Sequence, residues 1–234
     1  MPVVTLTNIS LAFGIDQILD SIDLSIEKRE RLAFAGRNGA GKSTLLGIVA
    51  GDVAVDDGEV WRADGHKFVT LAQNLPERSE LTIYDSVASV FDELGTLLAE
   101  YHQLTQMAAD QLDTKRLGQL QSSLDHLDGW NINHWIEATL NQLNLDPEAT
   151  LSSLSGGWLK RVAIAQSLVQ EPDVWILDEP TNHLDVEGIE WLQSVLLEFS
   201  GTILFVSHDR QLLQAVATTI IAIDRGRVTR YNCD

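Results

Sequence analysis

The chain has 234 residues, 44% hydrophobic and 21% charged, and this composition excludes a mainly disordered protein. Sixteen Lys and Arg residues against 34 Asp and Glu residues give it a formal net charge of −18. Such an acidic surface repels phosphate backbones, so direct DNA binding by this domain is not expected.

Membrane insertion and secretion are not expected either. No apolar run approaches the roughly 20 residues of a membrane helix, and no basic region followed by an apolar stretch marks the N-terminus. The single cysteine, Cys233, cannot form an internal disulfide. We therefore expect a cytoplasmic protein.

Hydrophobic patterning predicts the secondary structure along the chain. Apolar positions predict five strands in the first part, at 3–13, 18–26, 31–35, 58–61 and 68–71, with a helix running through Ala50. Spacings of three and four predict amphipathic helices within 85–145, at 94–107, 117–127 and 135–143, with a break at 129–131. The rest alternates as strand 174–177, helix 186–199, strand 202–207, helix 210–217 and hairpin 220–231. This alternation predicts a parallel α/β core in which the helical block is an insertion.

The most specific motif is the run Gly36-Arg37-Asn38-Gly39-Ala40-Gly41-Lys42-Ser43-Thr44, which fits G-x-x-x-x-G-K-[ST] between a strand and a helix. Its glycines let consecutive backbone N–H groups turn toward a phosphate at a helix N-terminus. Lys42 would place a cation on the terminal phosphates, and the Ser43 hydroxyl would bind Mg²⁺. A nucleoside triphosphate site is therefore predicted.

Further polar residues follow predicted strands. Asp178 and Glu179 end the apolar run 174–177, where a ligand crevice of an open α/β sheet is expected. Asp178 suits a Mg²⁺ contact, and Glu179 could orient or deprotonate a water molecule. Gln73 and His208 also lie just past strands, although such residues are often only structural.

Six motifs in this order resemble the ATP-binding cassette (ABC) ATPase domain over the whole chain. The motifs are Gly36–Thr44, Gln73, Leu154–Gly157, Val174–Glu179, Pro180–Asp185 and Ser207–Asp209. The resemblance implies an α/β fold with a P-loop NTPase core of ABC type, an antiparallel β subdomain and an inserted α-helical subdomain that carries the signature motif. It implies one ABC domain over 1–234, with the core in 1–84 and 171–234 and the insertion in 85–170.

The form Asn182-His183-Leu184-Asp185 is similar to the ABC-F branch of this family. The run 152–159 and the short helical insertion resemble the first ABC domain of Uup-type proteins. This resemblance implies a chain that is either an excised first domain, which the match favours, or a natural single-cassette protein. Trp158 departs from the pattern, because most ABC domains have Gln at this position, and it could alter the domain interface.

The resemblance also implies roles for individual residues. The cofactors are ATP and Mg²⁺, with Ser43, Gln73 and Asp178 at the metal and Gly36–Thr44 at the phosphates. Lys42, Glu179 and His208 are the implied catalytic residues. Phe13 matches the aromatic residue that stacks on adenine, with a core phenylalanine as an equal alternative. The signature residues would bind the γ-phosphate of ATP held by the opposite ABC domain; they are Ser155, Gly156 and Gly157.

The expected function is that of an ATPase cassette in a soluble ABC-F protein associated with the ribosome and translation. A second ABC domain is the expected partner, in a longer parent chain or in a head-to-tail homodimer. The block 85–130 matches the arm that reaches toward tRNA or ribosomal protein, but its 2 basic and 8 acidic residues equally favour a solvated subdomain. The alternatives are an ATPase subunit of an ABC transporter and an ATPase of DNA metabolism.

Overall fold

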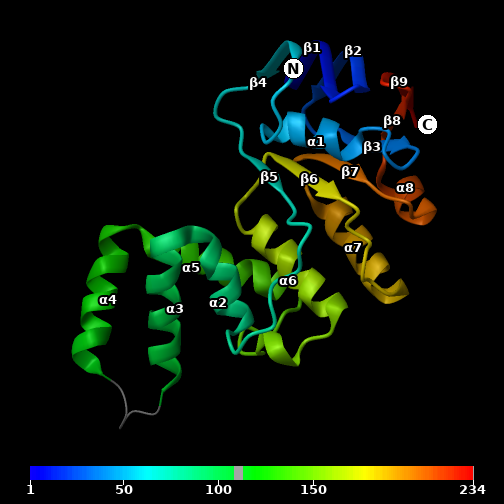
Figure 1. The fold of residues 1–234 in the computed structure, drawn as a ribbon. Coiled ribbons are helices and arrows are strands. Elements are labelled where there is room, and N and C mark those ends of the chain that lie inside the picture. The colour runs from blue at the N-terminus through cyan, green and yellow to red at the C-terminus, as the bar shows by residue number, and fades with distance from the viewer. Residues whose placement is uncertain (108–112, 234) are drawn as a thin grey trace. The chain divides into compact units, whose positions relative to one another are not determined.

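The computed structural model describes residues 1–107 and 113–233, so residues 108–112 of the predicted helical block lie outside the described part (Figure 1). The chain divides into two compact units. The core unit comprises Met1–Gln73 and Glu171–Asp234, and the helical unit comprises Asn74–Gln170. The helical unit begins before residue 85 because the preceding segment pairs with residues 149–152. For example, the Leu151 N–H donates to the Leu81 carbonyl at 3.0 Å.

The core unit contains a six-stranded sheet in the order β5-β6-β7-β3-β8-β9. The strands are β3 (Arg31–Gly36), β5 (Phe68–Thr70), β6 (Val174–Asp178), β7 (Thr202–Val206), β8 (Thr219–Asp224) and β9 (Arg227–Asn232). The first five strands in that order pair in parallel, and only β9 runs antiparallel to its neighbour. All five residues of β7 are buried, as expected of a parallel strand covered on both faces.

A second, antiparallel sheet in the core unit has the order β2-β1-β4. Its strands are β1 (Pro2–Phe13), β2 (Asp16–Glu27) and β4 (Asp57–Arg62). Helix α1 (Lys42–Ala50) contacts β3, β5, β6 and β7, while Leu45 and Ile48 on this helix share a buried cluster with Leu6 and Ile9 of β1. One hydrophobic core therefore joins both sheets around α1. The unit also contains α7 (Val186–Glu198) and α8 (Arg210–Val216), which contact each other.

The helical unit is built from α-helices and short 3₁₀ turns (Figure 1). Its elements are α2 (Ile83–Ala88), η1 (Ser89–Phe91), α3 (Asp92–Gln106), α4 (Thr114–His126), α5 (Gly129–Gln142), η2 (Leu151–Ser153) and α6 (Gly156–Leu168). Leu98, Leu120 and Leu124 form part of its buried core, so the predicted amphipathic helices bury their leucine faces. No helix in the described parts of the chain combines the length and apolar character needed to cross a membrane.

The predicted fold class is confirmed, with differences in the helical block. The expected break at 129–131 is wrong because Asp128 takes a left-handed φ of 56° and the helix α5 begins immediately at Gly129. Helix α2 was not predicted because six residues are fewer than two turns, too short for a helical period to show, and because all six are buried, including the polar Asp85 and Ser86.

Candidate functional site

Four neighbouring strands bring the predicted core motifs to one edge of the large sheet. In the order β5-β6-β7-β3, Gln73 follows the first strand, Asp178 ends the second, His208 follows the third and the phosphate loop (Gly36–Thr44) follows the fourth. These strands are parallel, so their carboxyl ends share an edge. The core unit therefore gathers residues that lie far apart in the sequence.

The phosphate loop has a backbone that requires glycine at two positions. Gly41 is the N-cap of α1 with a left-handed φ of 97°, and a Cβ there would lie 2.8 Å from Ile18 Cγ2. A Cβ on Gly36 would lie 2.6 Å from the Ile223 carbonyl oxygen of β8. The loop is thus held between β2, β8 and its own helix, while Arg37, Asn38 and Gly39 remain exposed.

Lys42 lies inside this loop and is only 9% exposed. Its Nζ donates to the Gly36 carbonyl at 3.0 Å and to the Arg37 carbonyl at 3.1 Å. The loop backbone therefore positions the ammonium group. Ser43 follows in the first turn of α1 and is exposed, so its hydroxyl is accessible to a ligand at the helix N-terminus.

Gln73, Asp178 and Ser43 line a common cavity of about 290 Å³. The Gln73 Nε2 donates to Asp178 Oδ2 at 2.8 Å. Hydroxyl, amide and carboxylate oxygens are the donors that Mg²⁺ prefers, so this set fits the expected metal. Among the described residues, no group of three or more His, Cys, Asp or Glu side chains could hold a metal ion. A Mg²⁺ ion held by Ser43, Gln73 and Asp178 would take its remaining ligands from phosphate oxygens and water.

Glu179, the residue after Asp178, forms a pair with His208. Glu179 Oε1 lies 3.2 Å from His208 Nε2, with the glutamate side chain 21% exposed and the histidine 65% exposed. Glu179 has a φ of 48°, and its N–H donates to the Val206 carbonyl of β7 at 3.0 Å. The Glu179 carboxylate therefore contacts the imidazole of His208, which follows the adjacent strand β7, and solvent reaches both side chains.

Sequence reasoning missed a hydroxyl pair that ties together the segments after β6 and β7. Thr181 Oγ1 lies 3.3 Å from Ser207 Oγ, and Ser207 Oγ accepts from the Asp209 N–H at 3.1 Å. Ser207 is buried, with 6% exposure. The only sequence signal was the position of both residues beside recognised motif residues.

Phe13 is 57% exposed at the end of β1, opposite Asp16 of β2. This exposure contradicts the alternative of a core phenylalanine, because a core side chain would be buried. An exposed ring on the core unit is available for stacking.

The signature residues belong to the helical unit, so the core unit does not itself contain all the predicted site residues. Ser155 is the N-cap of α6, and its hydroxyl accepts from the Trp158 N–H at 3.4 Å. Gly156 and Gly157 form the first turn. Trp158 is 40% exposed, and the Arg161 guanidinium carbon lies 4.6 Å from its ring centre.

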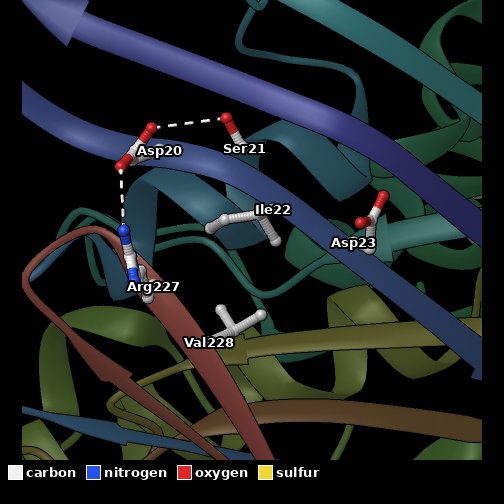
Figure 2. Close-up of a pocket in the computed structure, with 6 residues that line it drawn as sticks. All are labelled: Asp20, Ser21, Ile22, Asp23, Arg227 and Val228. Carbon is white, nitrogen blue, oxygen red and sulfur yellow. Dashed lines mark hydrogen bonds and ion pairs between the residues drawn. The ribbon is translucent and has the colours of Figure 1, made fainter.

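The core unit has a further hollow, of about 480 Å³, that sequence analysis did not indicate. It lies between β2 and β9, with Asp20, Ser21, Ile22 and Asp23 on one side and Arg227 and Val228 on the other (Figure 2). Arg227 Nη2 is 4.0 Å from Asp20 Oδ2, with the arginine side chain 80% exposed and the aspartate side chain 48% exposed. None of the predicted site residues lines this hollow.

Comparison with known proteins gives one family match and many similar sequences. The family model described as ABC transporter matches residues 19–182. The chain is 45% identical to the ATP-binding protein Uup of Haemophilus influenzae, over 99% of this chain and 36% of that protein. It is 36% identical to the energy-dependent translational throttle protein EttA of Mycobacterium tuberculosis, over 97% of this chain and 41% of that protein. The chain therefore spans well under half the length of these relatives.

Solved structures match the fold at low sequence identity. A nucleotide-free ATP-binding cassette from an ABC transporter has a TM-score of 0.75 at 18% identity, covering 100% of this chain and 92% of the other. The ADP conformation of an ATP-binding cassette of an ABC transporter has a TM-score of 0.74 at 20% identity, with the same coverage of 100% and 92%. These likenesses support the fold alone.

Proposed function

This chain belongs to the ABC transporter family as an ATPase domain of the ABC-F branch, and we propose that its phosphate loop, Gln73, Asp178, Glu179 and His208 form the MgATP site. One observation carries this proposal. Four adjacent parallel strands deliver these motifs to a single edge of the sheet, where Lys42 is already held by the loop carbonyls.

The phosphate loop would bind the β- and γ-phosphates through its backbone N–H groups and Lys42. Ser43, Gln73 and Asp178 would hold Mg²⁺, which when bound neutralises charge on the phosphate oxygens. The Gln73 amide oxygen would be the atom left to bind the metal, since the Nε2 of this residue donates to Asp178. The exposed ring of Phe13 would stack on the adenine.

Glu179 is the proposed base for hydrolysis. Its carboxylate would accept a proton from the water that attacks the γ-phosphate, and His208 beside it would contact the transferring phosphoryl group. The distance of 3.2 Å between Glu179 Oε1 and His208 Nε2 supports this division of roles. ADP and inorganic phosphate would be the products.

Loss of Lys42 provides a direct test of the site. We expect Lys42→Ala to weaken MgATP binding by at least about tenfold, because a charge-assisted contact to the phosphates is removed. Lys28→Ala, which removes the same charge from an exposed turn, serves as the matched control. Unchanged affinity of Lys42→Ala in titration calorimetry would contradict the proposal.

The complete site is proposed to need a second ABC domain. Ser155, Gly156 and Gly157 would bind the γ-phosphate of ATP held by that partner, and the position of Ser155 at the N-terminus of α6 supports such a contact. Dilute chain should then hydrolyse ATP slowly, with specific activity that rises with concentration. Repulsion between two chains of −18 charge would weaken this pairing at low salt.

Mixing two inactive variants tests the composite site. In a head-to-tail pair of Lys42→Ala and Ser155→Arg chains, one site has both defects and the other has neither. We therefore expect the mixture to recover activity that neither variant shows alone. If dilute Ser155→Arg were as active as the unaltered chain, the site would be complete within one chain.

We further propose that the protein containing this domain acts on the ribosome in translation and lies in the cytoplasm. The support is the relative described as a translational throttle protein, which is 36% identical to this chain. Nucleotide-dependent co-sedimentation of the protein that contains this domain with ribosomes would test it, using Glu179→Gln to retain ATP. Sedimentation with membranes instead would favour a transporter subunit.

A further inference from the structure

Arg62 joins the antiparallel sheet to the helix that follows the phosphate loop. It is the last residue of β4, where it pairs with Val4 of β1. Its Nε donates to the Val49 carbonyl at 2.8 Å, and its Nη2 donates to the Ile48 carbonyl. Both acceptors lie in the last turn of α1.

This contact provides hydrogen-bond donors to the backbone carbonyls at the C-terminal end of α1. The final carbonyls of a helix have no partners within the helix, and the helix C-terminus attracts positive charge. At this end the N–H groups of Gly51, Asp52 and Val53 all donate to the Gly47 carbonyl, and Gly51 also reaches the Ile48 carbonyl. The Val49 carbonyl receives the Arg62 guanidinium, which fixes the helix end with charge-assisted hydrogen bonds.

The same two elements carry the two halves of the proposed nucleotide site. Lys42 and Ser43 lie at the N-terminus of α1. Because this helix is only nine residues long, movement of its C-terminal end also moves its N-terminal end. Phe13 ends β1, the central strand of the sheet that carries Arg62. The guanidinium is therefore a polar link between the phosphate-binding helix and the base-stacking sheet.

We propose that Arg62 is a positioning residue that keeps these two parts in register, so that adenine and triphosphate are bound jointly. This inference rests on the proposed MgATP site. Two contacts on a rigid frame reinforce each other, whereas contacts on parts that move separately must be ordered at additional entropic cost. A residue that only stabilised the fold would affect both parts of the ligand alike.

The test compares MgATP with magnesium tripolyphosphate, which lacks the base and ribose. By titration calorimetry we expect Arg62→Ala to weaken MgATP binding about tenfold and tripolyphosphate binding less than about threefold, because only the joint contact is lost. Phe13→Ala should weaken MgATP binding in the unaltered chain and have little further effect in Arg62→Ala. Arg227→Ala, which removes an exposed Arg from the same unit, is the control.

Equal weakening of both ligands by Arg62→Ala, or additive effects of the Arg62 and Phe13 substitutions, would overturn the inference. Arg62→Lys, which retains the charge but not the forked donors, covers the case in which Arg62→Ala does not fold. Arg62→Lys should also weaken MgATP binding more than tripolyphosphate binding, but by a smaller factor. A lowered melting temperature with no such difference between the two ligands would contradict the proposal. If the unaltered chain failed to bind MgATP, the proposed function itself would fail.

Discussion

Replacing Glu179 with glutamine should separate ATP binding from ATP hydrolysis. Glutamine has the same length, and its amide can still reach His208 across the 3.2 Å that now separates Glu179 Oε1 from the imidazole. It cannot accept a proton from water. Loss of a general base typically lowers the rate by about 10²–10⁴, which corresponds to about 2.7–5.4 kcal/mol in activation free energy. ATP affinity should change little, because Glu179 does not line the cavity of Ser43, Gln73 and Asp178.

The assay is single-turnover hydrolysis at a protein concentration high enough for pairing, with calorimetry for ATP affinity. Glu190→Gln, an exposed glutamate of α7, is the matched control and should hydrolyse ATP at the unaltered rate. A rate for Glu179→Gln within about threefold of the unaltered chain would refute its role as the base, since general bases contribute far more. His208 would then be the next residue to test.

Three substitutions test local features of the structure. Gly41→Ala should destabilise the chain by about 1–3 kcal/mol in urea unfolding, because the new Cβ meets Ile18 and the backbone is left-handed; Gly118→Ala, which has open space around it in α4, should stabilise by up to about 1 kcal/mol. Burial, followed by the nearby carboxylates of Glu137 and Asp85, raises the pKa of Tyr84 above its ordinary value of 10.0. The stability from this shift is complete below the ordinary pKa and is lost as the pH rises above it. Above about pH 10 the free energy of unfolding of Tyr84→Phe should therefore fall less steeply with pH than that of the unaltered chain.

The sequence was most informative where the local backbone determines the chemistry. The glycines and Lys42 of the phosphate loop form a contiguous motif whose conformation follows from strand, turn and helix. The position of Asp178 at the end of an apolar strand also indicated the ligand edge of the sheet, whereas Gln73 and His208 were assigned to the site only through the resemblance to ABC domains. The structure adds the order of the strands, which makes these residues neighbours.

Contacts between distant segments could not be predicted in the same way. Arg62 lies 13 residues after Val49, and nothing in the local pattern of β4 indicates that its guanidinium reaches a helix end. The exposure of Phe13 depends on whether another layer covers the hairpin. Hydrophobic periodicity predicts the strand but not what packs against its end. Helix α5 begins at Gly129 because Asp128 adopts a left-handed backbone, which its residue type permits but does not require.

Backbone strain near Glu179 connects the fold to the proposed chemistry. Glu179 and His183 have φ values of 48° and 72°, a conformation that non-glycine residues adopt only when their surroundings require it. The Glu179 N–H donates to the Val206 carbonyl at 3.0 Å, and the Asn182 N–H donates to the Glu179 backbone carbonyl at 3.2 Å. The Asp185 carboxylate caps α7 by accepting from the Gly188 N–H at 2.8 Å. The turn is therefore fixed by contacts that do not involve the Glu179 carboxylate. For this reason Glu179→Gln should remove proton transfer while leaving the side chain where it is.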